Sequence, residues 1–457
     1  MAYVPNTEKD KREMLSAIGV DNIEKLLTDI PEEIRLKKEL NLPSPLSEIE
    51  LKKEMLSLSE KNADLLHYTS FLGAGAYDHY IPSVVEHMVS RSEFYTAYTP
   101  YQAEASQGML QSIYEFQSMI CELTGMEAAN ASMYDGASAT AEAAMMAVRI
   151  TKRKEILVSR ALHPNYRMVL KTYLQGIGIP IKEITFLPVG QTGKDGITDA
   201  DALSSFISDN TAAVIIQQPN FFGCIEDLSA ISAIAKKFGA LFIVSVDPIS
   251  MGILKSPGEL GADIVVGEGQ ALGNSLSFGG PYLGFFAARK EHVRQMPGRL
   301  VGATVDGQGK RGYCLTLQTR EQHIKRERAT SNICTNQALC ALAATVYLSV
   351  IGKEGLRKVA ELCLQKAHYA KREISKIKGF SSTFGASFFK EFVIKTPVSA
   401  EKIFKGLLKE KIIGGLELGN YYPELKEHLL ICVTEKRTRE EIERLINRMT
   451  EMAKKGG

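Results

Sequence analysis

The sequence has almost no excess of either charge. Its 457 residues include 55 Lys and Arg against 53 Asp and Glu, which leaves a formal net charge of +2. Nucleic acids and anionic membranes attract strongly basic surfaces, so we expect neither as a main partner. Hydrophobic residues make up 45% and charged residues 24% of the chain. This composition is typical of a globular protein and excludes a collagen-like or disordered chain.

Long apolar runs and paired cysteines are also missing. No apolar stretch approaches the roughly 20 residues that a helix needs to cross a bilayer. The N-terminal segment mixes acids and bases, unlike a secretory signal, so we expect a cytoplasmic protein. The seven cysteines show no CxxC or Cys/His cluster, which favours reduced thiols and no metal site.

The chain is predicted to contain a helical arm (residues 1–66), a large α/β domain (67–335) and a small α+β domain (336–457). In the large domain, short apolar runs alternate with helical segments, which indicates a largely parallel sheet covered on both faces. These runs are 155–159, 181–189, 212–218, 241–246, 263–267 and 282–288. A capping box formed by Thr438 and Glu441 predicts the start of the closing helix.

Common nucleotide and hydrolase motifs are absent. Gly73 and Gly75 form GxG, but Asp78 stands where a third glycine belongs, so we expect no dinucleotide site here. The loop 132–138 opens an alanine-rich helix, whose N-terminus could bind a phosphate. Simple capping by Asp135 or Ser138 explains the same loop equally well.

One strand end is typical of a particular cofactor chemistry. Asp247 closes the run 241–246, and another element follows near residue 271. This is the layout of fold-type I pyridoxal phosphate (PLP) enzymes, in which the carboxylate keeps the pyridinium nitrogen protonated and a later lysine forms a Schiff base. The later element holds no lysine, and the nearest ones, Lys255 and Lys290, stand at other places. The sequence thus predicts the shell of a PLP enzyme without its covalent anchor.

Long segments of the chain resemble glycine dehydrogenase (decarboxylating), the P-protein of the glycine cleavage system. They are YTPYQAEASQGMLQSIYEFQSMICELTGMEAANAS (98–132), SFGGPYLGFFA (277–287), MPGRLVG (296–302) and LQTREQHIKRERATSNICTNQAL (317–339). The resemblance runs from about residue 65 to the end, and the length resembles subunit 1 of the two-chain bacterial form. It implies a fold-type I PLP transferase-like large domain and a part in glycine decarboxylation.

The resemblance also implies where the cofactor is held. In this family only the second half, or the second subunit, carries the His-Lys-Thr whose lysine binds PLP. Here that lysine position falls on Ala271, between Gln270 and Leu272, and alanine cannot form an imine. The family therefore implies PLP on the partner, subunit 2, in an α2β2 assembly that transfers the aminomethyl group of glycine to the lipoylated H-protein. This chain would complete the active site across the interface.

The resemblance suggests which residues reach that shared site. A Thr-Ser-Asn stretch would contact the partner's cofactor phosphate, and a polar aromatic cluster would line the substrate channel, although packing explains the cluster as well. An Arg and a His could bind a carboxylate or form a structural ion pair. His163, where active relatives place a ring-stacking residue, and Asp247 would be vestigial. The predicted contacts are Thr330, Ser331 and Asn332 for the phosphate, and Tyr98, Thr99, Tyr101, Gln102, Arg320 and His323 for the channel.

Two other readings remain open from the sequence. A self-sufficient PLP decarboxylase would need a Schiff-base lysine outside the expected element, such as Lys255 or Lys290. A PLP-free scaffold or regulatory subunit would need no contact with the reaction at all.

Overall fold

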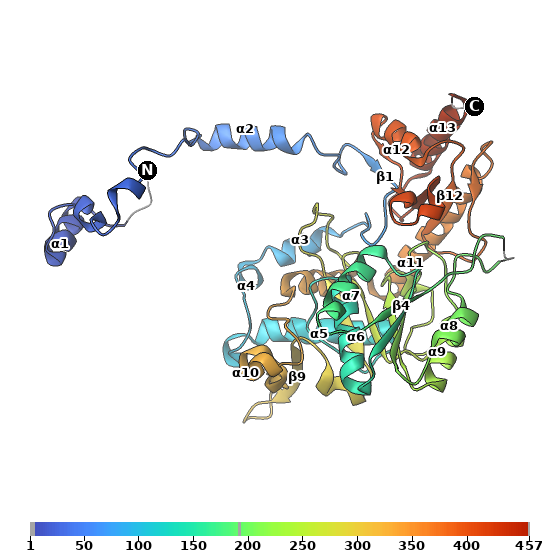
Figure 1. The fold of residues 1–457 in the computed structure, drawn as a ribbon, viewed down its shortest axis with the longest axis horizontal. Coiled ribbons are helices and arrows are strands. Elements are labelled where there is room, and N and C mark those ends of the chain that lie inside the picture. The colour runs from blue at the N-terminus through green and yellow to red at the C-terminus, as the bar shows by residue number, and fades with distance from the viewer. Residues whose placement is uncertain (1–4, 191–192, 456–457) are drawn as a thin grey trace. The chain divides into compact units, whose positions relative to one another are not determined.

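The structure, a computed structural model, describes residues 5–190 and 193–455 (Figure 1). The chain forms two compact units, one ending at Ala63 and one beginning at Asp64. The first unit ends slightly before the predicted boundary at residue 66. The predicted division at 335 and 336 falls inside the second unit and stays a prediction.

The first unit is helical, with α1 (Glu8–Ile18), α2 (Glu48–Ser59) and two short 3-10 helices, η1 (Ile23–Leu27) and η2 (Glu32–Ile34). Thr7 and Ser47 cap the two α-helices, each in a capping box that satisfies the first backbone N–H groups. No side chain in these four helices is buried. Many of the exposed side chains of this unit, in the helices and in the segment between η2 and α2, are nonetheless large and apolar, among them Ile18, Ile34, Leu36, Leu40, Leu42, Ile49, Met55 and Leu56.

A seven-stranded sheet forms the centre of the second unit, with strand order β2-β8-β7-β6-β5-β3-β4. Its central pairs are parallel, whereas β8 runs antiparallel to β7 and to β2. The six predicted runs all contain strands of this sheet. The strands are β2 (Ala128–Ala129), β3 (Glu155–Ser159), β4 (Ile181–Ile184), β5 (Thr211–Gln218), β6 (Leu241–Val246), β7 (Ile264–Glu268) and β8 (Gly284–Ala288).

Helices cover both faces of this sheet because both faces are apolar. Ala213 and Ile215 of β5 face the cluster that contains α6 (Gly136–Thr151) and α7 (Pro164–Gln175). Val214 and Ile216 face the opposite cluster. That cluster includes side chains of α5 (Gln107–Thr124), α8 (Ala200–Phe206), α9 (Leu228–Lys237) and α11 (Ala338–Ile374). The small residues of α6 let it pack closely on β5, β6, β7 and β8.

Helix α11 is the one described helix whose length and apolar composition would allow it to cross a membrane. The sequence pattern indicates no apolar stretch near the length that crosses a bilayer, and α11 is longer and more apolar than that expectation allows. Ala344, Tyr347 and Ala360 of this helix lie in the core of the second unit, and Gly352 interrupts its helical backbone. The helix therefore has a packing role in this structure.

Short helices and a hairpin lie between the core elements. The described ones are α3 (Ser83–Val89), α4 (Ser92–Tyr95), α10 (Gln322–Lys325) and the 3-10 helices η3 (Ala103–Ala105), η4 (Ser250–Gly252), η5 (Lys290–Gln295), η6 (Gln318–Arg320) and η7 (Arg326–Arg328). Strands β9 (Leu300–Val305) and β10 (Arg311–Thr316) form an antiparallel hairpin that the sequence pattern did not predict.

The C-terminal part has its own four-stranded antiparallel sheet, β11-β12-β15-β14, packed with α12 (Ala400–Lys409) and α13 (Arg439–Lys455). Its strands are β11 (Ser381–Ser382), β12 (Glu391–Lys395), β14 (Leu416–Glu417) and β15 (His428–Cys432), with η8 (Leu418–Asn420) and η9 (Pro423–Leu425) nearby. Strand β1 (Thr69–Ser70) pairs with β13 (Ile412–Ile413). This pairing brings residues 71–80 between the two sheets.

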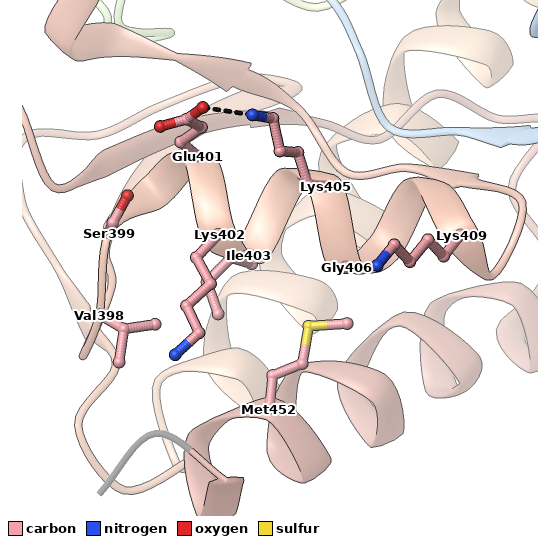
Figure 2. Close-up of a pocket in the computed structure, with 9 residues that line it drawn as sticks. All are labelled: Val398, Ser399, Glu401, Lys402, Ile403, Lys405, Gly406, Lys409 and Met452. Carbon is pink, nitrogen blue, oxygen red and sulfur yellow. Dashed lines mark hydrogen bonds and ion pairs between the residues drawn. The ribbon is translucent and has the colours of Figure 1, made fainter.

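A groove of about 470 Å³ lies between α12 and α13 (Figure 2). Its lining includes Lys402, Lys405, Lys409 and Met452. None of the residues predicted for the shared active site lines it, so we assign it no part in the chemistry.

Candidate active site

The functional region lies at one edge of the seven-stranded sheet. Asp247 follows β6 and Glu268 ends β7, and these parallel strands finish at the same edge. Ligands of open α/β sheets bind outside the carboxyl ends of the strands. The side chains at this edge therefore lie at the predicted position of a cofactor site.

The Asp247 carboxylate pairs with a buried lysine. Its Oδ2 lies 2.6 Å from Nζ of Lys390, whose exposed fraction is only 1%. Oδ1 accepts from the backbone N–H of Ile249 at 3.0 Å and so caps the turn after β6. The same ammonium lies 3.5 Å from the ring centroid of Tyr77, a cation–π contact. Burial alone would lower the pKa of Lys390, but the Asp247 carboxylate, Cys432 and Cys363 together outweigh it and raise the pKa.

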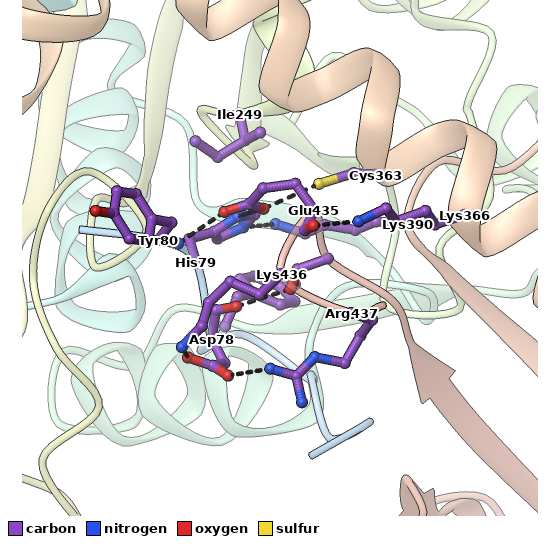
Figure 3. A network of polar contacts seen from close by, with 12 residues as sticks. Asp78, His79, Tyr80, Ile249, Cys363, Lys366, Lys390, Glu435, Lys436 and Arg437 are labelled. Carbon is purple, nitrogen blue, oxygen red and sulfur yellow. Dashed lines mark hydrogen bonds and ion pairs between the residues drawn. The ribbon is translucent and has the colours of Figure 1, made fainter. Parts of the chain in front are cut away.

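The lysine begins a buried chain of polar contacts that reaches the C-terminal sheet (Figure 3). Its Nζ donates to Nε2 of His79 at 3.0 Å, which leaves Nδ1 of that ring to donate to Glu435 at 2.6 Å. The backbone N–H of Tyr80 also donates to Glu435, at 2.7 Å. Burial alone would raise the pKa of Glu435, but these hydrogen bonds lower it to about 2. The chain ties the sheet edge to the segment after β15.

His79, Glu435 and Cys363 form a group whose residue types could hold a metal ion. Two ligands of one tetrahedral zinc lie roughly 3.3 Å apart, given bonds of about 2.0–2.1 Å. The 2.6 Å contact between His79 and Glu435 is shorter than that, and the Lys390 ammonium lies against the other nitrogen of the ring. These atoms bind one another, so the group does not fit a metal ion.

At the start of α6, where the sequence suggested that a phosphate could bind, the carboxylate of Glu268 lies instead. Asp135 and Ser138 form a capping box, as the alternative interpretation expected. The N–H of Gly136 donates to Oε2 of Glu268 at 3.0 Å, and the N–H groups of Gln270 and Leu283 donate to its Oε1. Burial raises the pKa of Glu268 to about 7 against these hydrogen bonds.

His163 stacks on a side chain of its own chain. Its ring lies 4.8 Å from that of Tyr166, with an interplanar angle of 23°. Nδ1 accepts from the N–H of Asn165, so the proton is on Nε2, which donates to the carbonyl of Ala74 at 2.8 Å. Burial lowers the pKa of His163 to about 4, which keeps the ring neutral.

A neighbouring loop covers the position of Ala271. Ala271 is 3% exposed. Gln270 accepts from the N–H of Tyr77 at 2.8 Å and donates to its carbonyl at 3.1 Å. Glu391 accepts from the Tyr77 hydroxyl and from the N–H of Ala74. The segment that contains the GxG motif therefore lies across the site.

Lys255 and Lys290 lie at the other edge of the sheet. Because β8 is antiparallel to β7, Gly284 pairs with Glu268, and Ala288, just before Lys290, lies at the start of β7. The loop that follows Lys255 is held at that same edge, where Arg289 donates to the carbonyl of Gly258. Both lysines are exposed. The topology places neither near Asp247.

One predicted channel residue, Tyr101, contacts Arg299, a buried residue that the sequence motifs did not indicate, and a second, His323, packs against Tyr101. Its guanidinium donates to the Tyr101 hydroxyl at 3.3 Å and to Asn336 at 3.2 Å, and it also binds the carbonyl of Cys334. Glu321 lies 3.7 Å from its Nε. The His323 ring packs edge-on against Tyr101 at 5.5 Å. Tyr98 is 78% exposed, Thr99 is half-buried and Gln102 is exposed.

Arg320 has a structural role in this chain. It is buried, and its guanidinium donates to the carbonyls of Leu317 at 3.1 Å, of Gly298 at 3.0 Å and of Met296. The guanidinium was expected to bind a carboxylate or form an ion pair, but its hydrogen bonds go to backbone carbonyl oxygens. Its place in the substrate channel stays a prediction.

The predicted phosphate-contact segment follows Arg320 and ends beside the start of α6. The N–H of Thr330 donates to the Arg320 carbonyl, Ser331 is buried with its hydroxyl accepting from Ile333, and Asn332 is exposed. Just beyond, the side chain of Asn336 and the N–H of Gln337 donate to the hydroxyl of Ser132, at 2.9 and 3.0 Å.

The site does not fit PLP in this chain. The Lys390 ammonium forms an ion pair with the Asp247 carboxylate, and the Tyr166 ring stacks on the His163 ring. The Glu268 carboxylate accepts from the backbone N–H at the start of α6. Ala271 offers no amine. The sequence search missed Lys390, Tyr166 and Glu268, although Lys390 and Glu391 do interrupt an otherwise apolar run at 388–394.

Fold and site together define the architecture of fold-type I PLP enzymes, as predicted. A solved sphingosine-1-phosphate lyase from Burkholderia pseudomallei matches with a TM-score of 0.64 over 93% of each chain, at 15% identity. A likeness at that identity shows the fold alone. The family model described as glycine cleavage system P-protein matches residues 1–449, and the chain belongs to this family.

Close relatives refine the family assignment. The chain is 58% identical to a probable glycine dehydrogenase (decarboxylating) subunit 1 of Desulforamulus reducens, over 98% of this chain and 99% of the relative. It is 57% identical to the protein of the same name from Desulfitobacterium hafniense, over 99% and 100%. A crystal structure of inhibitor-bound glycine decarboxylase (P-protein) matches with a TM-score of 0.88 and 41% identity, over 99% and 100%. The predicted family and the subunit 1 type are confirmed.

Proposed function

We propose that this chain is the subunit of a two-chain glycine decarboxylase that does not hold the cofactor. Subunit 2 would bind PLP covalently, and the two chains would form an α2β2 assembly in the cytoplasm. PLP supplies the electron sink that glycine decarboxylation needs. The aminomethyl group would pass to the lipoyl arm of the H-protein, and this chain would supply binding and positioning contacts.

One observation carries the proposal. The strand-end carboxylate that would hold a pyridinium is retained, yet it pairs with Lys390 at 2.6 Å, and the anchor position is a buried alanine. A chain built this way retains the shape of a PLP enzyme and cannot react alone. Its relatives carry the words "subunit 1" in their names, which supports a second chain.

The exposed apolar side chains of residues 5–63 support a partner as well. Soluble monomers rarely expose large apolar patches, and such patches mark interaction sites. Helix α2 has no buried side chain, and its apolar Ile49 is 82% exposed. We propose that subunit 2 covers this first unit.

The segment 330–332 and the residues around Arg299 are the proposed contacts to the shared active site. Thr330, Ser331 and Asn332 would serve the phosphate of the partner's cofactor. Tyr98, Thr99, Tyr101, Gln102 and His323 would line the channel, and Arg320 would shape it through its carbonyl contacts. Tyr101 is held by Arg299, which leaves its ring in a fixed place.

The test is glycine-dependent exchange of labelled bicarbonate with PLP and lipoylated H-protein, using this chain, subunit 2 and their mixture. We expect activity only in the mixture. Activity from this chain alone would overturn the proposal. A scaffold role without contact to the reaction predicts that Thr330→Ala leaves turnover unchanged in the assembled complex, whereas the shared site predicts a raised apparent Kd for PLP.

A further inference from the structure

We infer that Lys390, Tyr166 and Glu268 fill the former cofactor site from within and take over the contacts of its cationic ring nitrogen, its aromatic ring and its phosphate. The inference rests on the proposed function, because it explains how the subunit without cofactor keeps its site closed. A cofactor of this type presents a cationic ring nitrogen, a flat aromatic ring and an anionic phosphate. Each has a counterpart in a side chain of this chain.

The cationic end is the Lys390 ammonium. It contacts the Asp247 carboxylate at 2.6 Å and lies over the Tyr77 ring. A buried carboxylate without a cation is strongly unfavourable, so loss of a cofactor at this position requires another positive charge. Lys390 comes from the segment before β12, far along the chain from Asp247.

The aromatic part is Tyr166. Its ring stacks on His163, the residue at the ring-stacking position. Its hydroxyl lies so close to Gly136 that a Cβ atom built there would be 2.3 Å away. Tyr166 therefore extends from the stacking residue to the start of α6.

The anionic end is Glu268. Its carboxylate accepts from the N–H of Gly136 and from two further backbone N–H groups, all at 3.0 Å. An anion at a helix N-terminus meets free N–H groups and the positive end of the dipole. Glu268 thus satisfies the donors that a phosphate would otherwise use.

The contacts form one continuous set. His163 donates to the Ala74 carbonyl, the N–H of Ala74 donates to Glu391, and Glu391 accepts from Tyr77, whose ring covers Lys390. The cationic and aromatic replacements are therefore joined through residues 74–77. This arrangement predicts that removing the Tyr166 ring opens a space for a pyridine phosphate, and that removing the Lys390 ammonium as well frees the Asp247 carboxylate.

The test uses the isolated full chain and pyridoxamine 5′-phosphate, which cannot form an imine with a surface lysine. Fluorescence titration should show no saturable binding to the wild type or to Tyr166→Phe, which keeps the ring. The double variant Tyr166→Ala/Lys390→Met should bind saturably, with an affinity at least tenfold above the upper limit that the titration sets for the wild type, and the ligand should raise its Tm. If circular dichroism shows that the double variant does not fold, Tyr166→Ala alone should still show the gain.

Wild-type binding as tight as that of the variants would overturn the inference, and so would variants that fold and gain no binding. The titration involves no turnover and no partner. Its failure is therefore separate from a failure of the exchange assay, which tests the shared active site.

Discussion

The ammonium of Lys390 lies 2.6 Å from the carboxylate of Asp247, and both side chains are almost completely shielded from solvent. Lys390→Met should lower the free energy of unfolding by about 3–5 kcal/mol, because an unpaired carboxylate stays buried. Urea titration of the isolated chain measures this change. Lys390→Met combined with Asp247→Asn should recover most of the loss, and strictly additive losses would contradict the pairing.

Glu435 gives the chain a predictable acid sensitivity. Its pKa is about 2 in the folded state against 4.5 as the ordinary value, so its stabilisation is complete above pH 4.5 and is lost as the pH falls through 2. This term should shrink by about 2 kcal/mol between pH 7 and pH 3. The difference in unfolding free energy between the wild type and Glu435→Gln should narrow by that amount, and a constant difference would refute the assignment.

Arg299 should affect catalysis through the residues that it positions. Arg299→Lys keeps the charge but cannot bind Tyr101, Asn336 and the Cys334 carbonyl together. The bicarbonate exchange rate of the mixed chains should fall roughly tenfold or more, since small displacements of positioning groups are costly. The surface variant Arg372→Lys is the matched control. An unchanged bicarbonate exchange rate in Arg299→Lys would show that Arg299 does not position residues for catalysis.

The first unit should be needed for assembly and dispensable for folding. Removal of residues 1–60 should leave the circular dichroism and Tm of the second unit close to those of the full chain, since the two units are compact separately. Light scattering of the truncated chain mixed with subunit 2 should show separate species. A full-sized complex would show that the partner does not depend on this unit.

Local patterns predicted much of the fold for clear physical reasons. The apolar runs match the central strands because both faces of the sheet are buried. The hairpin β9/β10 escaped prediction. Its strands are only partly buried and carry no continuous apolar run.

The position of the candidate site could be predicted from the sequence, but the side chains that fill it could not. The sequence pattern indicates that Asp247 follows a strand, and the structure has it directly after β6, because a strand end is a local feature. The role of Ala271 stays a prediction. Lys390 looks like an ordinary surface charge in the sequence, and only the tertiary fold brings it to Asp247. For Arg320 the sequence indicated a role but not the right partners: the expected partner was a carboxylate, and the actual partners are backbone carbonyls.

The central claim is that this chain keeps a PLP-enzyme fold while its partner holds the cofactor. The most direct measurement is borohydride reduction of the assembled enzyme with PLP, followed by mass spectrometry of both chains. We predict a stable pyridoxyl adduct on one lysine of subunit 2 and none on this chain. A stoichiometric adduct on any lysine of this chain, Lys390 included, would contradict it.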